Sequence, residues 1–192
     1  MNRIRHYSLL ALIVLLTACV SVSRKPDLSQ LYGNKLDNSA PRPIIIIPGL
    51  MGSSLETAEG LEVWPGSITD LAFSDYEVLT KTLEQAANYR LATPGQVQRG
   101  NDMRRYYLFA YDWRRSNART AVQLHELIEQ IRRDFGDPAL KVDLIAHSNG
   151  GLIARYYLQY GPTETAQAGW QPKAWAGGGE RIRRWVILGT RN

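Results

Sequence analysis

The stretch LIAHSNGG, residues 144–151, constrains the fold more than any other part of this sequence. The apolar run from Val142 to Ala146 is typical of a buried strand. Ser148 follows almost at once, and the small residues after it allow the chain to turn sharply. From Leu152 to Tyr160 the pattern becomes helical, and Gly161-Pro162 ends it. The segment therefore predicts a strand, a tight turn with a serine at its tip, and a helix.

Other apolar runs extend this pattern along the chain. Ile44–Ile47, Tyr106–Tyr111 and Trp185–Leu188 are predicted strands, and their continuous apolar character is typical of strands covered on both faces. Apolar residues recur at helical spacing from Val122 to Phe135, and Gly136 and Pro138 follow them. A helix that connects two such strands makes them parallel. We therefore expect an α/β fold, a mostly parallel sheet with helices on both faces.

Length and composition fit one domain of this kind. The chain has 192 residues, of which 44% are apolar, and this is enough for one sizeable core. We expect a signal peptide in residues 1–18, a polar tether in residues 19–40, and an α/β domain in residues 41–192. No P-loop, dinucleotide-binding glycine pattern or metal-ligand cluster is found, so no cofactor and no metal are expected.

The N-terminal signal resembles that of a bacterial lipoprotein. Arg3 and Arg5 precede an apolar run, Leu9–Leu16, that is too short to span a bilayer. Leu16-Thr17-Ala18-Cys19 resembles a lipobox, in which the cysteine is acylated and becomes the new N-terminus. An ordinary export signal with an incidental cysteine is the alternative. Lipidation of Cys19 predicts a protein anchored in the bacterial cell envelope, and Val20 rather than aspartate after it favours the outer membrane, facing the periplasm.

The charge of the chain gives little support for nucleic-acid binding. The formal net charge is +5, part of which lies in the signal peptide. Arginine pairs recur at separated positions without interleaved aromatic residues, which is more typical of a solvated surface than of a nucleic-acid site, although they would also suit anionic lipid headgroups. The sequence therefore predicts no nucleic-acid partner.

A serine between a buried strand and a helix has a chemical interpretation. It lies at the carboxyl edge of a parallel sheet, where ligands bind, and Ala146-His147-Ser148-Asn149-Gly150 matches the nucleophile elbow G-x-S-x-G with alanine in the first glycine position. Ser148 is then the candidate nucleophile. The amide of Asn149, at the helix N-terminus, is a candidate oxyanion donor. An ordinary strand-to-helix turn is the structural alternative.

A second segment supports this interpretation. Ile44–Ile47 runs into Pro48-Gly49-Leu50-Met51-Gly52-Ser53, and folds with such an elbow place the second oxyanion amide in a loop of this kind. Leu50 is the candidate donor. Taken alone, Pro48-Gly49 would be an ordinary turn.

Several segments together resemble one family. The segments 48–53 (PGLMGS), Trp64-Pro65, 111–114 (YDWR), 146–151 (AHSNGG) and 188–190 (LGT) occur in the order seen in the lecithin:cholesterol acyltransferase family, which includes phospholipid:diacylglycerol acyltransferases and lysosomal phospholipases. The resemblance runs from about Arg42 to the end of the chain. It implies an α/β-hydrolase that attacks a lipid ester, forms an acyl-serine, and passes the acyl group to an alcohol or to water.

The remaining members of a catalytic triad are not visible in the chain. A serine nucleophile needs a histidine base, and the histidine needs a carboxylate. In this fold both follow the serine, yet the three histidines are His6, His125 and His147. We expect a truncated chain, inactive alone, whose missing part carries the triad acid and base.

Other candidate residues have both structural and functional interpretations. Met51 and Trp64 could line an acyl pocket or fill core, and His147 is expected to pack beside the substrate rather than act as base. His125 is expected at the surface or half-buried. An ion pair with Arg114 is favoured for Asp112, and Asp143 begins the nucleophile strand, on the wrong edge of the sheet for a triad.

Three functional hypotheses follow. The first is a membrane-anchored O-acyltransferase or lipase that acts on a phospholipid or another acyl ester. The second is an esterase of the same fold that acts on soluble esters. The third is a non-catalytic truncated lipoprotein.

Overall fold

The computed structural model describes residues 40–53, 66–97, 102–164 and 173–191, with side chains from residue 76 onward in the helix that begins at Gly66. The chain divides into two compact units, residues 1–35 and 36–192, and every described residue belongs to the second. The signal peptide, nearly all of the tether, Cys19 and Trp64 lie outside the described residues.

Five parallel strands form one sheet. They are β1 (Ile44–Ile47), β2 (Arg90–Leu91), β3 (Arg105–Leu108), β4 (Val142–His147) and β5 (Ile182–Leu188), in the spatial order β2-β3-β1-β4-β5. β1 lies centrally and all four of its isoleucines are buried, as its unbroken β-branched run predicts. The predicted α/β class with a parallel sheet is confirmed.

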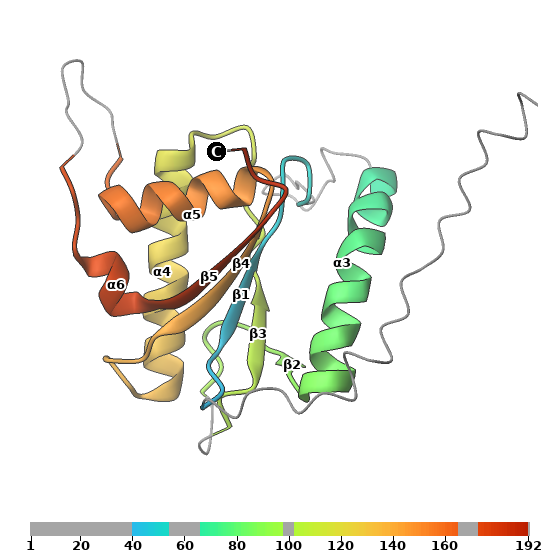
Figure 1. Cartoon of the computed structure of the whole chain (residues 1–192), viewed down its shortest axis with the longest axis horizontal. Helices are drawn as coiled ribbons and strands as arrows, with labels where there is room; N and C mark the ends of the chain where they lie inside the picture. The colour runs from blue at the N-terminus through green and yellow to red at the C-terminus, as the bar shows by residue number, and fades with distance from the viewer. Residues whose placement is uncertain (1–39, 54–65, 98–101, 165–172, 192) are drawn as a thin grey trace, which may run out of the picture. The chain divides into compact units, whose positions relative to one another are not determined.

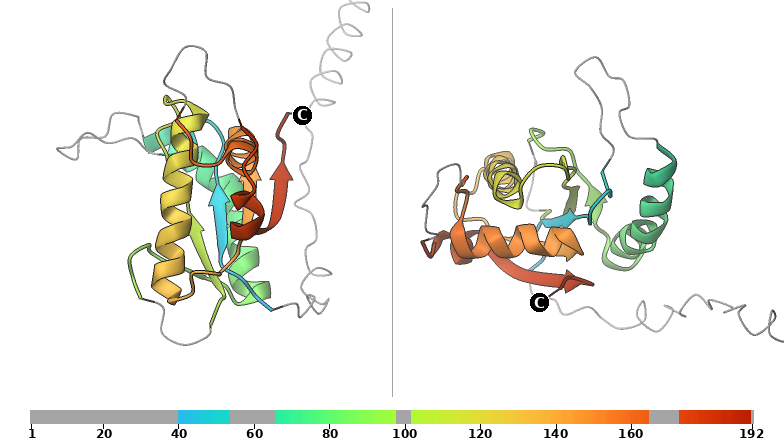
Figure 2. Two further views of the ribbon diagram at one scale, coloured as in Figure 1. Left: turned by 90° about the vertical axis from the view of Figure 1, so that its left-hand side faces the viewer. Right: turned by 90° about the horizontal axis from the view of Figure 1, so that it is seen from above.

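Four helices are described with the sheet: α3 (Gly66–Ala87), α4 (Asn117–Phe135), α5 (Asn149–Tyr160) and α6 (Gly177–Arg181). Figures 1 and 2 show α4 and α5 together on one side of the sheet and α3 on the other. α4 begins where the Ser116 hydroxyl accepts a hydrogen bond from the Arg119 amide, and it ends at Gly136, whose φ of 64° is left-handed.

Alternate residues of the strands face two cores. Ile45, Ile47, Leu144 and Ala146 face α4 and α5, whose residues Leu124, Ile128, Ile131, Ile153 and Tyr157 complete the larger core. On the opposite face, Ile44, Ile46 and Tyr106 pack against Tyr76, Leu79 and Leu83 of α3. Helices therefore cover both faces of the sheet, as expected for buried strands.

The structure differs from the sequence-based expectations at element ends. The strand expected over residues 106–111 ends at Leu108, and the strand expected from Trp185 begins at Ile182. A register shift beside Val142 and Asp143 places both Ile182 and Trp185 against the larger core, which strict alternation would prevent. α3, β2 and α6 were not predicted. β2 has two residues and α6 has five, which are too few to show a period. Tyr76, Leu79 and Leu83 do recur at helical spacing in α3, and this signal could have found that helix.

Within the described residues, no helix is long and apolar enough to cross a membrane.

Candidate active site

The predicted site segments meet at the carboxyl edge of the sheet. Residues 48–53 follow β1, residues 109–114 follow β3, Ser148 follows β4, and residues 189–191 follow β5. Because all these strands are parallel, their carboxyl ends lie at one edge, at the top of Figure 1. Segments far apart in the sequence thus come together at this edge, where hydrogen bonds join Pro48 to Tyr111, 63 residues apart, and Tyr76 to His147, 71 residues apart.

Ser148 occupies the corner between β4 and α5. Its backbone angles are φ 50° and ψ −119°, a combination that glycine adopts far more readily than a residue with a β-carbon. Its amide donates to the Leu188 carbonyl at 2.9 Å, and its carbonyl accepts from the Thr190 hydroxyl at 2.9 Å. The end of β5 therefore holds the backbone of the serine in this conformation.

The glycines after the serine allow α5 to approach the sheet closely. A β-carbon on Gly150 would lie 2.7 Å from the Pro48 carbonyl oxygen, and one on Gly151 would lie 2.8 Å from Cβ of Thr190. Both are shorter than a van der Waals contact, so neither position accepts a side chain without movement. Ala146, at the first glycine position of the motif, is completely buried in the larger core.

Asn149 begins α5 directly after the serine. Its side-chain amide donates to the Tyr111 hydroxyl at 3.2 Å and to Oδ1 of Asn117 at 3.2 Å. The Asn117 amide donates back to Oδ1 of Asn149 at 3.3 Å. The first residue of α5 is therefore tied to the first residue of α4, and its backbone amide lies at the positive end of the α5 dipole.

The loop after β1 forms a tight turn beside the serine. The Gly52 amide donates to the Gly49 carbonyl at 3.1 Å, and Met51 has a left-handed φ of 60°. A β-carbon on Gly49 would lie 3.1 Å from Cβ of Ser148, which shows how closely loop and serine approach. The side chains of Leu50 and Met51 are exposed, to 54% and 38%. The loop thus presents apolar surface next to Ser148.

His147 lies beneath this loop. Its Nδ1 is 2.7 Å from the Tyr76 hydroxyl, and the two rings meet edge to face with centroids 5.7 Å apart. The Gly49 amide donates to the same hydroxyl at 2.9 Å. The hydroxyl can accept from Gly49 and donate its own proton to Nδ1 at the same time. Tyr76 was not singled out from the sequence, because α3 itself was not predicted.

Asp112 forms the ion pair that the sequence favours. Its carboxylate accepts from Nε of Arg114 at 2.8 Å and from Nη2 at 2.9 Å, and from Nε of Arg115 at 3.3 Å. The hydrogen bond from Arg114 is the main reason that the pKa of Asp112 is lowered to about 2. Asp143 is paired as well, with Arg183 at 2.5 Å from Nη2, near the amino end of β4.

His125 contacts other residues than Ser148. It is half-buried on α4, where Nδ1 lies 3.0 Å from the Tyr157 hydroxyl and its ring packs edge to face on Trp175. Burial lowers its pKa. Among the histidines of the described segments, neither His125 nor His147 makes a hydrogen bond to Ser148, so this part of the chain shows no assembled triad.

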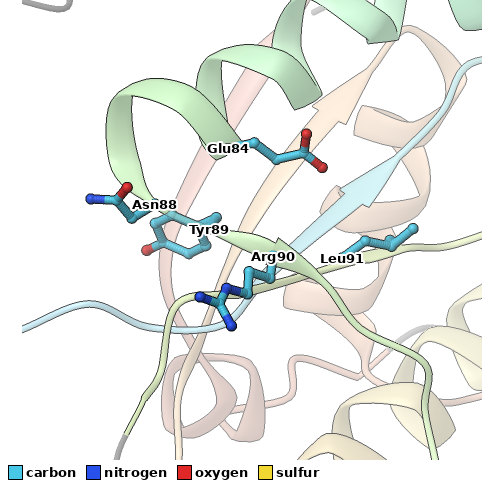
Figure 3. Close-up of a pocket in the computed structure, with 5 residues that line it drawn as sticks. All are labelled: Glu84, Asn88, Tyr89, Arg90 and Leu91. Carbon is cyan, nitrogen blue, oxygen red and sulfur yellow. The ribbon is translucent and has the colours of Figure 1, made fainter.

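Metal binding is not indicated by the described residues, which contain no cluster of three metal-ligating side chains. A hollow of about 440 Å³ lies elsewhere, at the amino edge of the sheet, lined by Glu84, Asn88, Tyr89, Arg90 and Leu91 (Figure 3). Arg90 and Leu91 pair with the first residues of β3, which places this hollow at the opposite edge from Ser148.

Comparison with known proteins supports the resemblance noted in the sequence. The lysosomal phospholipase A and acyltransferase of Homo sapiens is 35% identical over 95 residues, which are 48% of this chain and 19% of that protein. The chain thus spans about a fifth of the length of this relative. No solved structure matches it.

A family model gives the broader match. The model of lecithin:cholesterol acyltransferase matches residues 69–190, a range that contains Tyr111–Arg114 and the Ser148 corner. The range covers more than half of the chain. The protein is therefore a member of the lecithin:cholesterol acyltransferase family.

Proposed function

We propose that this protein carries the nucleophile and the oxyanion site of a lipid O-acyltransferase or lipase, with Ser148 as the acyl-accepting residue. The observation that carries the proposal is the corner itself, a serine with φ 50° at the carboxyl edge of a parallel sheet, followed directly by a helix N-terminus. Strained backbone clusters at functional sites, and a nucleophile elbow places its serine at a sharp strand-to-helix corner of this kind. Membership of an acyltransferase family supports the same reaction class.

The amides of Leu50 and Asn149 are the proposed oxyanion donors. Attack of the serine oxygen on an ester carbonyl places negative charge on the carbonyl oxygen, and donors fixed beforehand stabilise that charge. The Leu50 amide lies in the turn beside Cβ of Ser148, and the Asn149 amide begins α5. Collapse of the tetrahedral intermediate releases the alcohol and leaves an acyl-serine, which an alcohol or water then attacks.

Apolar side chains near the serine support a lipid substrate. Leu50 and Met51 are exposed on the loop beside Ser148, where they would contact an acyl chain rather than the reacting ester. We propose this acyl-contact role for Met51, with His147 beside the substrate and Trp64 as a further pocket residue. We also propose that the histidine base and its carboxylate come from sequence outside these 192 residues, so that this chain alone has little activity.

The test is covalent labelling of Ser148. The purified chain is incubated with a fluorophosphonate that carries a long alkyl group, with and without added imidazole as an external base, and the adduct is located by peptide mass spectrometry. We expect an adduct on Ser148 that forms faster with imidazole, because the chain contains the proposed nucleophile and oxyanion donors but not the proposed base. Ser148→Ala removes the adduct, and Ser116→Ala, which changes the α4 cap, retains it.

The outcomes separate the alternatives. Equal rates with short-chain and long-chain phosphonates, in solution and on phosphatidylcholine vesicles, would favour an esterase for soluble esters. Absence of any adduct on Ser148 in a folded chain, even with imidazole, would favour the non-catalytic lipoprotein and end the proposal.

Anchoring through Cys19 is a separate proposal, supported by the lipobox-like sequence Leu16-Thr17-Ala18-Cys19 and proposed to hold the protein at the outer membrane. An alkyne-labelled fatty acid fed to bacteria that express the chain should appear on the protein, and Cys19→Ser should remove both the label and membrane fractionation. Export without the label in the unaltered protein would favour an ordinary signal peptide.

A further inference from the structure

The peptide that carries the Leu50 amide is held through its carbonyl group. The Gly49 carbonyl belongs to the same peptide plane as the Leu50 N–H, and it accepts hydrogen bonds from the Tyr111 hydroxyl at 3.2 Å and from the Gly52 amide at 3.1 Å. A trans peptide is planar, with its N–H directed opposite to its C=O. Fixing the direction of the carbonyl therefore fixes the direction of the Leu50 N–H.

The same tyrosine hydroxyl also contacts the second proposed donor residue. Nδ2 of Asn149 donates to it at 3.2 Å, and the single hydroxyl proton is shared between the Pro48 carbonyl at 3.1 Å and the Gly49 carbonyl at 3.2 Å. One oxygen atom thus connects the turn that carries the Leu50 amide to the residue that begins α5.

Tyr111 is itself firmly placed. It is only 4% exposed, its ring stacks on Phe109 with centroids 5.8 Å apart, and its amide donates to the hydroxyl of Ser53 at 3.1 Å. Burial is the main reason that its pKa is raised, so the hydroxyl keeps its proton and remains a donor at neutral pH.

Tyr76 holds the preceding peptide from the other face of the sheet. Its hydroxyl accepts from the Gly49 amide, whereas Tyr111 donates to the Gly49 carbonyl. Tyr76 belongs to the core under α3, and Tyr111 to the core under α4 and α5. Gly49 is therefore bound on both sides, by groups from two separate cores.

Resting on the function proposed above, we propose that Tyr111 is a positioning residue for the acyl transfer, whose hydroxyl orients the Leu50 amide toward the oxyanion by holding the Gly49 carbonyl. Tyr76 supports the neighbouring peptide, between Pro48 and Gly49, from the other side. Neither side chain needs to touch the substrate. Loss of the Tyr111 hydroxyl should therefore slow the chemical step and leave substrate binding unchanged.

The variant that tests this is Tyr111→Phe, which removes one oxygen and keeps the ring stacked on Phe109. Tyr157→Phe is the matched control, since Tyr157 is a fully buried tyrosine whose hydroxyl contacts His125. Labelling of Ser148 by the long-chain fluorophosphonate, with imidazole present, gives the maximal rate and the half-saturating concentration separately. Residual dipolar couplings of the Leu50 amide report its orientation without any reaction.

We expect Tyr111→Phe to change the Leu50 coupling and to lower the maximal labelling rate about tenfold or more, with the half-saturating concentration unchanged. Loss of a whole oxyanion donor lowers a rate by a factor of about 10²–10³, and a misdirected donor should cost less. Tyr157→Phe should change neither the coupling nor the rate. Tyr76→Phe should speed hydrogen exchange of the Gly49 amide, and it should lower the maximal labelling rate less than Tyr111→Phe does.

Two results would overturn the inference: an unchanged Leu50 coupling in Tyr111→Phe, or a changed coupling with an unchanged labelling rate. A wild-type chain that is folded but never labelled would instead overturn the proposed function, and the coupling of Leu50 would still decide whether Tyr111 orients that peptide.

Discussion

Ser148 holds backbone angles that residues with a β-carbon adopt at a cost. Its amide donates to the Leu188 carbonyl, and its carbonyl accepts from the Thr190 hydroxyl and the Gly151 amide. These three hydrogen bonds oppose relaxation of the corner. Residues in sparsely populated backbone regions cost on the order of 1–3 kcal/mol each. The serine conformation should therefore lower the free energy of unfolding relative to a residue that adopts these angles without strain.

This strain can be measured by comparing two substitutions of Ser148. Both Ser148→Gly and Ser148→Ala remove the hydroxyl, but only glycine relieves the strain. We expect the glycine variant to have a free energy of unfolding about 1 kcal/mol higher than the alanine variant. Urea titration of the two proteins checks this, and equal or reversed stabilities would show that the serine conformation carries no strain.

At the scale of elements, the close approach of α5 to the sheet depends on its first turn. Gly150 faces the backbone carbonyls of Ile47 and Pro48, which cannot move without displacing β1. The helix therefore reaches the strand end only if the residue at this position lacks a side chain.

Gly150→Ala should destabilise the protein by about 1–3 kcal/mol, because the added methyl group overpacks a site bounded by backbone atoms. Gly179→Ala is the control, since a β-carbon on Gly179 has no neighbour within 4 Å and alanine is the better helix former. Thermal unfolding of both variants gives the comparison. A Gly150→Ala protein as stable as the control would contradict the close packing of α5.

The contact between α4 and α5 should depend on pH through His125. Burial lowers the pKa of this histidine. The charges of Arg181 and Arg132 also lower it, whereas the charge of Glu129 raises it. Because the folded pKa lies below the unfolded value of about 6.5, the contribution of the neutral ring is complete above that pH and is lost as the pH falls through the folded pKa.

We therefore expect the free energy of unfolding to fall between pH 7 and pH 5 more steeply in the wild type than in His125→Gln, which cannot titrate there. Denaturant titrations at a series of pH values check the difference. Parallel curves for the two proteins would show that His125 does not contribute to the pH dependence.

At the scale of the whole molecule, the two faces of the sheet are covered unequally. Val186 and Leu188 pair in register with Ile145 and His147, on the face where α3 lies, yet they are 48% and 41% exposed. β5 pairs only with β4 among the described strands. An exposed edge strand with apolar side chains is a site at which chains associate.

Val186→Lys should reduce concentration-dependent association of this chain, because a lysine on an edge strand opposes pairing with another chain. Light scattering over a range of protein concentrations gives the measurement. Leu91→Lys, an exposed apolar residue on the opposite edge strand β2, is the control and should have a smaller effect, since β2 has only two residues.

The sequence by itself determined the elements whose pattern is strong and local. The isoleucine run of β1, the apolar run of β4, the period of α4 and the small residues after Ser148 each follow from burial and turn geometry within a few residues. These were enough to predict the parallel sheet and the position of the serine at its carboxyl edge. Ser148, Asn149 and Leu50 stay predictions as functional residues until they are labelled or mutated.

Only the tertiary structure decided which side chains support that corner. Tyr76, Tyr111 and Thr190 come from three different segments, and no spacing in the sequence relates them to Gly49 or Ser148. Their hydrogen bonds form because parallel strands bring distant loops to one edge of the sheet, where helices packed on both faces add polar groups. Such contacts depend on how whole elements pack, and a local pattern of residues does not contain that information.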